Sequence, residues 1–522
     1  MCGILGVVGK IEPALFESCL KSISHRGPDN SNSIECDGPG VTFGFNRLIV
    51  NGDGVYANQP FVDENTTWAI CNGEIFNHKE IENTIEYSPM SGSDCEVLIP
   101  AFKFWSFPTF CNKLDAEFAL MMYDTITKTL WVARDPYGVR PLFWGQTDTG
   151  AYAFASEMKA LHTICRSCEQ FHPGHFMRVD CQGTVPVMAE YTRYSVGLQA
   201  IGYKYLSNVY ACNKIRHLLS SAVQKRLMCD AGGVCCLLSG GLDSSLVSGL
   251  ANRFSRDPIH TFSIGMKGST DLAYAKEVAD SIGSVHHTVC LPESEFLGAI
   301  PEVIRAIESY DVTTVRASVG NYLIGKYIKE NTSFKVVLNG DYSDEVTGGY
   351  LYMKLAPGKD EFHTECKRLV DNIHYFDSLR SDRCICAHGL EARAPFADKE
   401  FVEFYLSMDP GVSSPPGKME KYLLRDAFRC DMLIPDNVLW RTKEAFSDGV
   451  SGVENSWHVI ARKHAMSLGF VSEEEYYKSV FDDEYGQHNR GVIPYKWMPK
   501  YCDSTDPSAR TICTHTTPSV AP

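Results

Sequence analysis

Two styles of hydrophobic patterning divide the chain. From Met1 to about Val187, short apolar runs separated by turn residues predict strands, among them VTFGFNRLIV, TTWAICNGEIF and EFALMMYDTITKTLWVARD. Neighbouring strands of this kind are typical of antiparallel sheets. From about Asn208 the strands alternate with helical patterns, as in GVCCLLSGG followed by LDSSLVSGLANRF. This alternation predicts a doubly wound parallel sheet, so we expect a multidomain α/β protein.

The change of style also places the domain boundaries. A chain of 522 residues is too long for one ordinary core. We expect a first domain over residues 2–187, a linker over 188–207, a second domain over 208–505 and a loosely ordered tail over 506–522.

Composition and charge exclude several classes of protein. The formal net charge is −15 and the sequence has no dense Lys/Arg stripe, so we expect no nucleic-acid partner. No apolar run is long enough to span a bilayer, so we expect no membrane partner. Twenty cysteines without a secretory signal pattern indicate reduced thiols and a cytoplasmic protein.

The N-terminal sequence MCGILGVVGK places a cysteine directly after the initiator methionine. A secretory signal would need a basic residue before the apolar run, and myristoylation would need glycine at position 2. A short buried strand explains Ile4, Leu5, Val7 and Val8. It does not explain Cys2.

The sequence LLSGGLDSS, residues 237–245, lies between a predicted strand and a predicted helix. Exposed amides and the helix dipole favour an anion at such a place, although a plain strand-to-helix turn is the alternative. No GxxxxGK[ST] motif occurs. The motif instead resembles the PP-loop of ATP pyrophosphatases, in which Asp243 would help to hold Mg²⁺. Asp344 is the second candidate carboxylate, with a solvated turn aspartate as the alternative interpretation.

Together the motifs resemble a known family. MCGI, RGPD, CNGEIFN, SGSDCE, DPYGVRPLFW and ASEMKAL resemble the glutaminase domain of class II amidotransferases. LLSGGLDSS, YDVTTVRASVGNYL, HGLEARAPFADKEF, EKYLLRDAF and LWRTKEAFSDG resemble the synthetase domain of glutamine-hydrolysing asparagine synthetases, and WMPKYCDSTDPSART resembles the eukaryotic form. The resemblance implies an N-terminal Ntn-hydrolase αββα sandwich and a C-terminal ATP-pyrophosphatase domain.

For the first domain the resemblance implies that Met1 is removed and that Cys2 is the N-terminal nucleophile. An α-amino group titrates near ~7.7 to 8.0, so it can serve as the base for the thiol. Asn72 and the N–H of Gly73 match the oxyanion hole. The matching glutamine-binding residues are Arg47, Asn72, Gly73, Glu74 and Asp94.

For the second domain the resemblance implies ATP-dependent formation of β-aspartyl-AMP, from which ammonia displaces AMP to give asparagine. The expected ligands are glutamine, aspartate, ATP and Mg²⁺, the ammonia would pass through an interdomain tunnel, and the family is often homodimeric. Lys443 matches the cation beside the α-phosphate, and Leu238 and Ile264 match residues of the adenine pocket. The matching nucleotide-binding residues are Leu238, Ser239, Gly240, Gly241, Asp243, Ser244, Ile264, Asn339 and Gly340.

One motif departs from the family, which usually carries SGEGSDE where this chain reads NGDYSDE, residues 339–345. The glutamate implicated as a base toward ammonia is here Asp341, whose carboxylate reaches less far, and a glycine is here Tyr342. Three alternatives follow. The site is slow but active, it is tuned to another carboxylic acid, or the synthetase half is an impaired nucleotide-binding or regulatory domain beside a working glutaminase.

Two weaker signals have mundane explanations. The pairs Cys165/Cys168 and Cys384/Cys386 lack a second pair at zinc-site spacing, so we expect no metal or redox role for them. His286 and His287 lie at a predicted strand start, where we expect structural histidines with satisfied hydrogen bonds.

Overall fold

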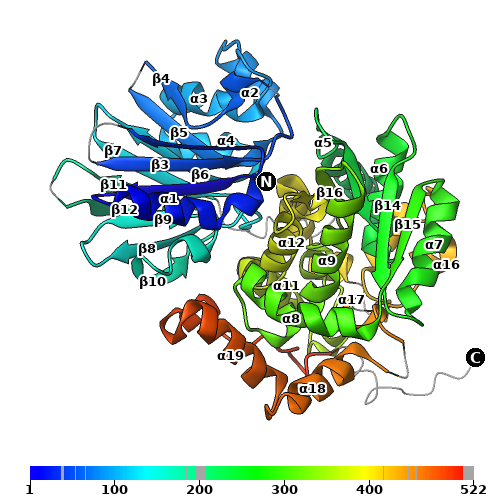
Figure 1. The fold of residues 1–522 in the computed structure, drawn as a ribbon. Helices are drawn as coiled ribbons and strands as arrows, with labels where there is room; N and C mark the ends of the chain where they lie inside the picture. Colours follow the sequence, from blue (N-terminus) through cyan, green and yellow to red (C-terminus); the bar gives the residue numbers. More distant parts are fainter. Residues whose placement is uncertain are drawn as a thin grey trace, which may run out of the picture.

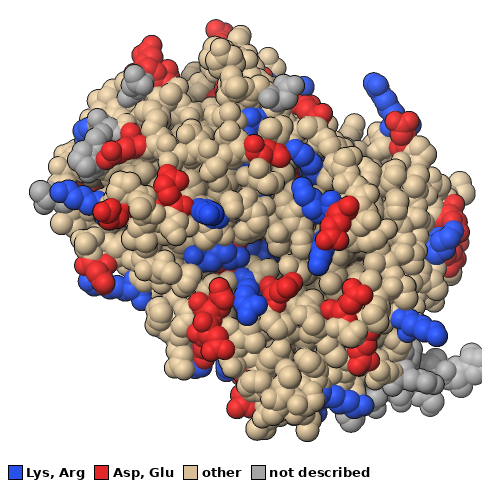
Figure 2. Space-filling view, in the orientation of Figure 1, with Lys and Arg blue, Asp and Glu red and all other residues tan. Residues whose placement is uncertain are grey.

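The computed structural model describes residues 1–36, 40–52, 54–64, 66–183, 185–195, 207–414, 417–444, 446–452 and 455–508. Two bodies lie side by side, with the N-terminus at their junction (Figure 1). None of the described helices is long and apolar enough to cross a membrane. On the face shown in Figure 2, side chains of both charges are interspersed.

The first body is a sandwich of two antiparallel sheets. One has the order β10-β8-β9-β1-β3-β2 and the other β12-β11-β7-β6-β5-β4. The strands of the first sheet are β1 (Gly3–Val8), β2 (Asn30–Glu35), β3 (Val41–Arg47), β8 (Phe143–Thr147), β9 (Tyr152–Ala155) and β10 (Cys165–Gln170). Those of the second are β4 (Phe61–Asp63), β5 (Thr67–Ile75), β6 (Ala116–Asp124), β7 (Thr129–Arg134), β11 (His175–Asp180) and β12 (Val187–Arg193).

Apolar residues from both sheets fill the space between them. Ile4 and Phe45 of the first sheet and Ile70 and Met121 of the second are fully or almost fully buried in one cluster. Such interdigitation of two inner faces is what holds a sandwich together. The outer faces are covered by α1 (Pro13–Ser22) on one sheet and by α2 (His78–Thr84), α3 (Leu98–Phe104) and α4 (Phe107–Lys113) near the other (Figure 1).

The second body is built on a five-stranded parallel sheet with the order β15-β14-β13-β16-β17. Its strands are β13 (Val234–Leu237), β14 (His260–Gly265), β15 (Val285–Cys290), β16 (Val336–Leu338) and β17 (Glu391–Arg393). The first strand, β13, lies in the middle, and the strand order turns outward on either side of it. In a doubly wound sheet, ligands bind where the order reverses, which here is between β13 and β16.

Helices cover this sheet on both sides and extend beyond it. They are α5 (Asn208–Lys225), α6 (Leu242–Phe254), α7 (Thr270–Ile282), α8 (Glu293–Ile307), α9 (Val312–Asn331), α10 (Ser343–Thr347), α11 (Lys359–Asn372), α12 (Asp377–Cys386), α13 (Lys399–Ser407), α14 (Pro410–Ser413), α15 (Tyr422–Phe428), α16 (Asp436–Leu439), α17 (Phe446–Gly449), α18 (Trp457–Ser467) and α19 (Glu473–Tyr485). The helix predicted for LDSSLVSGLANRF coincides with α6.

The fold-class prediction is confirmed, with two differences in detail. β12 continues to Arg193, so the start of the segment expected as a linker is a paired strand; residues 196–206 lie outside the described residues. In the expected tail, Asp506 forms an ion pair with Arg316 (2.9 Å) and the hydroxyl of Ser508 donates to Asp448 (2.8 Å). These contacts hold the start of the tail against the second body, and residues 509–522 lie outside the described residues.

Candidate active sites

Cys2 lies at the start of β1, beside the chain that leaves β3 and next to β5. Its N–H donates to Oδ1 of Asn72 (3.0 Å), and its Sγ lies 3.9 Å from the carbonyl oxygen of Leu48. The guanidinium of Arg26 donates through Nε to the carbonyl oxygen of Cys2 (2.9 Å). Asn72 and Arg26 therefore fix the backbone of this cysteine, and its thiol faces the chain that leaves β3.

Asn72 has a second, free hydrogen-bonding group. Among the described residues, its buried Nδ2 has no hydrogen-bond partner. An unpaired buried donor is costly unless a ligand uses it, and an amide donor next to a nucleophile suits an oxyanion. Gly73 follows on β5, where an added Cβ would lie 2.4 Å from the carbonyl oxygen of Glu117. This close approach accounts for the glycine.

As long as Met1 is present, the free α-amino group of the chain belongs to Met1 and not to Cys2. Burial raises the pKa of Cys2 to about 11, against the opposing effect of the neighbouring α-ammonium. That α-ammonium forms a buried ion pair with Glu391 of the second body (3.0 Å). With Met1 in place, the nitrogen of Cys2 is an amide and cannot act as a base.

Four of the predicted glutamine-binding residues, Arg47, Asn72, Glu74 and Asp94, are buried. Arg47 donates to Oδ1 of Asn58 (2.7 Å) and to backbone carbonyls of the following loop, including those of Gly54 and Gly52. Asp94 accepts from the N–H of Ile75 (2.7 Å). These contacts hold a cation and an anion rigidly, as recognition of an α-amino acid requires.

Glu74 connects the two bodies. Its carboxylate accepts from Nδ2 of Asn51 (2.7 Å) and lies 3.2 Å from the guanidinium of Arg393 on β17. Burial, together with the carboxylates of Asp94 and Glu391, raises the pKa of Glu74 well above its ordinary value. One of the predicted glutamine contacts is therefore positioned by the second body.

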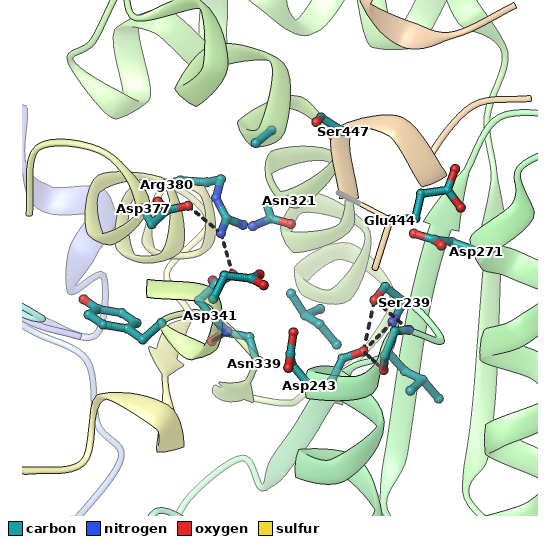
Figure 3. Close-up of a pocket in the computed structure, with 18 of the residues that line it drawn as sticks. Ser239, Asp243, Asp271, Asn321, Asn339, Asp341, Asp377, Arg380, Glu444 and Ser447 are labelled. Carbon is teal, nitrogen blue, oxygen red and sulfur yellow. Dashed lines mark hydrogen bonds and ion pairs between the residues drawn. The ribbon is translucent and has the colours of Figure 1, made fainter. Parts of the chain in front are cut away.

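The second site is a pocket at the switch point of the parallel sheet. Ser239 and Ser244 close the loop after β13, since the N–H of Ser239 donates to the Ser244 hydroxyl (3.1 Å). Gly340, in the loop after β16, approaches so closely that an added Cβ would lie 2.6 Å from the backbone nitrogen of Ser244. The two loops thus form one wall, and Figure 3 shows Ser239, Asp243, Asn339 and Asp341 around the pocket.

The predicted nucleotide residues fall into two groups. Those that line the pocket are Leu238, Ser239, Gly241, Asp243, Ser244, Ile264, Asn339 and Gly340. Gly240 instead has a φ of +72° and faces α7, where a Cβ would lie 2.4 Å from the backbone nitrogen of Ala275. Its contribution is the turn itself, which glycine adopts without strain.

Two lysines and two aspartates form a charged cluster in this pocket. Nζ of Lys443 lies 2.6 Å from Asp344 and 3.8 Å from Asp243. Nζ of Lys421 lies 2.7 Å from each of the same carboxylates. The sequence interpretation did not single out Lys421, although EKYLLRDAF contains it. Burial opposes the charge of Asp344, yet the two ammonium groups hold the pKa of its carboxyl well below the usual range.

The carboxylates fit a magnesium site of the kind that nucleotides complete. Both contact one ammonium group, so they converge on a small volume at the edge of the loop. Mg²⁺ is commonly held by one or two carboxylates and by substrate phosphates. Asp243 and Asp344 offer the two carboxylates of such a site, and the ammonium group of Lys421, which pairs with both in this structure, would have to turn aside for an ion to lie between them.

The motif NGDY, residues 339–342, which differs from that of the family, forms hydrogen bonds with side chains of α12. Oδ1 of Asp341 accepts from Arg380 (2.6 Å), which also bonds Asp377 (3.1 Å), as Figure 3 shows. Oδ2 of Asp341 is buried and has no hydrogen-bond partner within the described ranges. Nδ2 of Asn339 donates to the hydroxyl of Ser381 (2.7 Å). Arg380 is a second pocket residue that the sequence interpretation missed.

The weaker sequence signals have structural explanations. The ring nitrogens of His286 bond the hydroxyls of Thr261 (2.9 Å) and Ser263 (3.1 Å), so this histidine is satisfied. The thiol of Cys386 donates to Asp382 (3.4 Å), and the guanidinium of Arg26 bonds both Cys386 (2.9 Å) and Asp382 (2.8 Å).

The fold and the two sites define a glutamine amidotransferase domain of the Ntn type joined to a nucleotide-binding α/β domain. Comparison with family models agrees, because residues 1–191 match a glutamine amidotransferase domain and residues 214–363 and 354–501 match asparagine synthase. The glutamine-hydrolysing asparagine synthetase of Homo sapiens is 39% identical, with 98% of each chain covered. The probable glutamine-hydrolysing asparagine synthetase of Acanthamoeba polyphaga mimivirus is 37% identical, over 98% of this chain and 99% of the relative. This chain belongs to the glutamine-hydrolysing asparagine synthetase family.

Proposed function

We propose that this protein amidates aspartate to asparagine in an ATP-dependent reaction that uses ammonia from glutamine. The observation that carries the proposal is the pairing of two complete sites in one chain. One has a nucleophile beside a free amide donor, and the other has a nucleotide loop beside paired carboxylates and lysines.

In the first site, the thiol of Cys2 attacks the amide carbon of glutamine once Met1 has been removed. The freed α-amino group, which Oδ1 of Asn72 orients, accepts the thiol proton. Nδ2 of Asn72 and the N–H of Gly73 stabilise the oxyanion. Arg47 binds the α-carboxylate of glutamine, and Asp94 and Glu74 bind its α-ammonium group. Ammonia leaves, and water hydrolyses the remaining thioester to glutamate.

In the second site, the β-carboxylate of aspartate attacks the α-phosphorus of ATP and pyrophosphate leaves. Lys443 stabilises the charge that develops on the α-phosphate. The loop after β13 holds the phosphates, and Leu238 and Ile264 border the adenine. When bound, Mg²⁺ offsets the charge of the leaving pyrophosphate, with Asp243 and Asp344 as its protein ligands.

Ammonia then attacks the activated carbonyl carbon. A carbon–nitrogen bond forms, the bond to AMP breaks, and the free Oδ2 of Asp341 accepts a proton from the incoming nitrogen. The ion pair with Arg380 holds the carboxylate in place. Asp341 thus serves as the base in spite of its shorter side chain.

A ligase for a different carboxylic acid is the second candidate, because Asn339, Asp341 and Tyr342 change the shape of the acceptor side of the pocket. A substrate panel separates the two. The Met1-processed protein is incubated with Mg-ATP, ammonium chloride and one carboxylic acid at a time, and AMP and pyrophosphate are measured. We expect release to be greatest with aspartate. Greater release with another acid would favour the second candidate.

A further inference from the structure

Asn51, in the loop between β3 and β4, has a buried side-chain oxygen that is not used within the protein. The residue is 9% exposed, and its Nδ2 donates to Oε2 of Glu74 (2.7 Å). Its Oδ1 is buried and has no hydrogen-bond partner among the described residues. A buried acceptor left unpaired costs free energy, so it is a reason to look for a ligand that donates to it.

The loop places Asn51 between the charged residues proposed to bind glutamine. Its backbone carbonyl oxygen accepts from Nη2 of Arg47 (3.3 Å), while its side chain bonds Glu74. The glycine that follows Asn51 packs closely on the segment before Asp94, since an added Cβ there would lie 2.8 Å from the backbone nitrogen of Ser93. Asn51 therefore contacts the cation and one carboxylate, and its neighbour contacts the segment that carries the other carboxylate.

The second body fixes the position of this loop. Oδ2 of Asp230, in the segment before β13, accepts from the N–H of Gly52 (3.1 Å). The N–H groups of Asp230 and Ala231 both donate to the carbonyl oxygen of Val50 (3.0 and 3.1 Å). Asn51 lies between these two anchored residues, so its amide is held in one place relative to Glu74.

The free oxygen of Asn51 suits the α-ammonium group of an amino acid, which carries three N–H donors. The carboxylates of Glu74 and Asp94 provide acceptors for two of them. A third carboxylate would be repelled by the first two, whereas an amide oxygen accepts a hydrogen bond without adding charge. The bond from Nδ2 to Glu74 also fixes the direction of the amide and leaves Oδ1 as its acceptor.

We infer that Asn51 is a glutamine-binding residue, whose Oδ1 accepts a hydrogen bond from the α-ammonium group of the substrate. This role rests on the proposed function, because it adds a contact to the same glutamine site. Asn51 is not among the residues that the family resemblance matched to this site, and its role follows from its contacts in this structure. The contact is remote from the reacting amide, so it acts on the binding of glutamine.

The test measures glutamine hydrolysis alone, as glutamate released by the Met1-processed protein. Asn51→Ala and Asn51→Leu are compared with the unsubstituted protein and with Asn83→Ala, a control at an exposed position on α2. Loss of a hydrogen bond to a charged group should raise the KM for glutamine about 10- to 100-fold in both Asn51 variants. We expect kcat to change less than about threefold, and we expect the control to change neither constant.

Alkylation of Cys2 by iodoacetamide separates the loss of a substrate contact from a disturbed site, because this reagent has no α-ammonium group. Its rate, measured by mass spectrometry of the N-terminal peptide, should stay within about twofold in both Asn51 variants. An unchanged KM in either folded variant overturns the role of Asn51. A raised KM that comes with a severalfold change in the alkylation rate also overturns it.

The outcome does not depend on the second site, since neither ATP nor aspartate is present. If the unsubstituted protein releases no glutamate, the proposed function fails and the role of Asn51 fails with it. Release of glutamate with the same KM in all variants rejects the role of Asn51 alone.

Discussion

The two sites of this molecule are held in place in different ways. In the glutaminase body, Cys2 directly precedes β1 of one sheet and Asn72 lies on β5 of the facing sheet, and their key contact is between a backbone N–H and a side chain. In the synthetase body, Asp243 and Asp344 lie in the first turns of α6 and α10, and their carboxylates pair with lysines from a distant part of the chain. The position of the first site is therefore set mainly by the two sheets, while the second site depends on the balance of its charges.

The two sites also differ in how closely they follow the motifs of the family. Four of the five positions predicted for glutamine lie in the family motifs quoted above, and Arg47, Asn72, Glu74 and Asp94 are buried. The departures gather on the loop after β16, and their new side chains bond α12: Tyr342 bonds Ser378 and Asn339 bonds Ser381. The altered motif is thus integrated into its surroundings and retains a free carboxylate oxygen on Asp341.

The largest effect is expected from removing the nucleophile. Cys2→Ala leaves no group that can form the thioester, so glutamine-dependent product should fall by more than ~10³-fold. Synthesis with ammonium chloride should continue, because the second site is untouched. Cys290→Ala, at an exposed cysteine, is the matched control and should change neither activity. Loss of ammonia-dependent synthesis in folded Cys2→Ala would contradict the separation of the two sites.

Lys443→Ala tests the synthetase site as Cys2→Ala tests the glutaminase site. It removes a cation from beside Asp344 and the proposed α-phosphate position, so pyrophosphate release should fall by ~10²- to 10³-fold. Glutamate production should be retained, since the glutaminase body is intact. Lys276→Ala is the control, because Lys276 is exposed and pairs only with Asp280 on the same helix among the described residues. A proportional loss of both activities would indicate a folding defect.

Asn72→Ala should affect glutamine hydrolysis alone, by ~10²-fold or more in kcat, because it removes the free Nδ2 donor. It also removes the acceptor that orients the nitrogen of Cys2. Asn83→Ala, at an exposed position on α2 of the same domain, serves as a control. Unchanged kcat with a raised KM would show that Asn72 binds substrate without stabilising the oxyanion.

The smallest effect concerns stability in the synthetase body. Burial lowers the pKa of His286 from 6.5 to about 4, so this histidine is neutral when folded and gains a proton on unfolding. Between these two pKa values the unfolded chain binds more protons than the folded protein. The contribution of His286 to the free energy of unfolding therefore falls as the pH drops from about 6.5 toward 4. His286→Gln should flatten the dependence of Tm on pH over this window. His217→Gln, at an exposed position, is the control. An equal change in the pH dependence of Tm in the two variants would contradict the role given to His286.

Much of this architecture was predictable because its signals are local. The strands around Cys2 and the strand–loop–helix unit at SGGLDSS show in a few consecutive residues. The roles of Lys421 and Arg380 could not be predicted, because a lysine or arginine in a helical segment gives the same sequence pattern whether it faces solvent or a distant carboxylate. The ion pair of Met1 with Glu391, 390 residues away, likewise depends on how two bodies meet. Patterning along the chain carries no information about such contacts.

The central claim is that both sites work and that nitrogen passes from one to the other. The most direct test is to incubate the Met1-processed protein with aspartate, Mg-ATP and ¹⁵N-amide glutamine and to analyse the products by mass spectrometry. The account predicts ¹⁵N-asparagine together with glutamate, AMP and pyrophosphate. Glutamate and labelled ammonia without ¹⁵N-asparagine would contradict it, and would leave a working glutaminase attached to a domain that does not make asparagine.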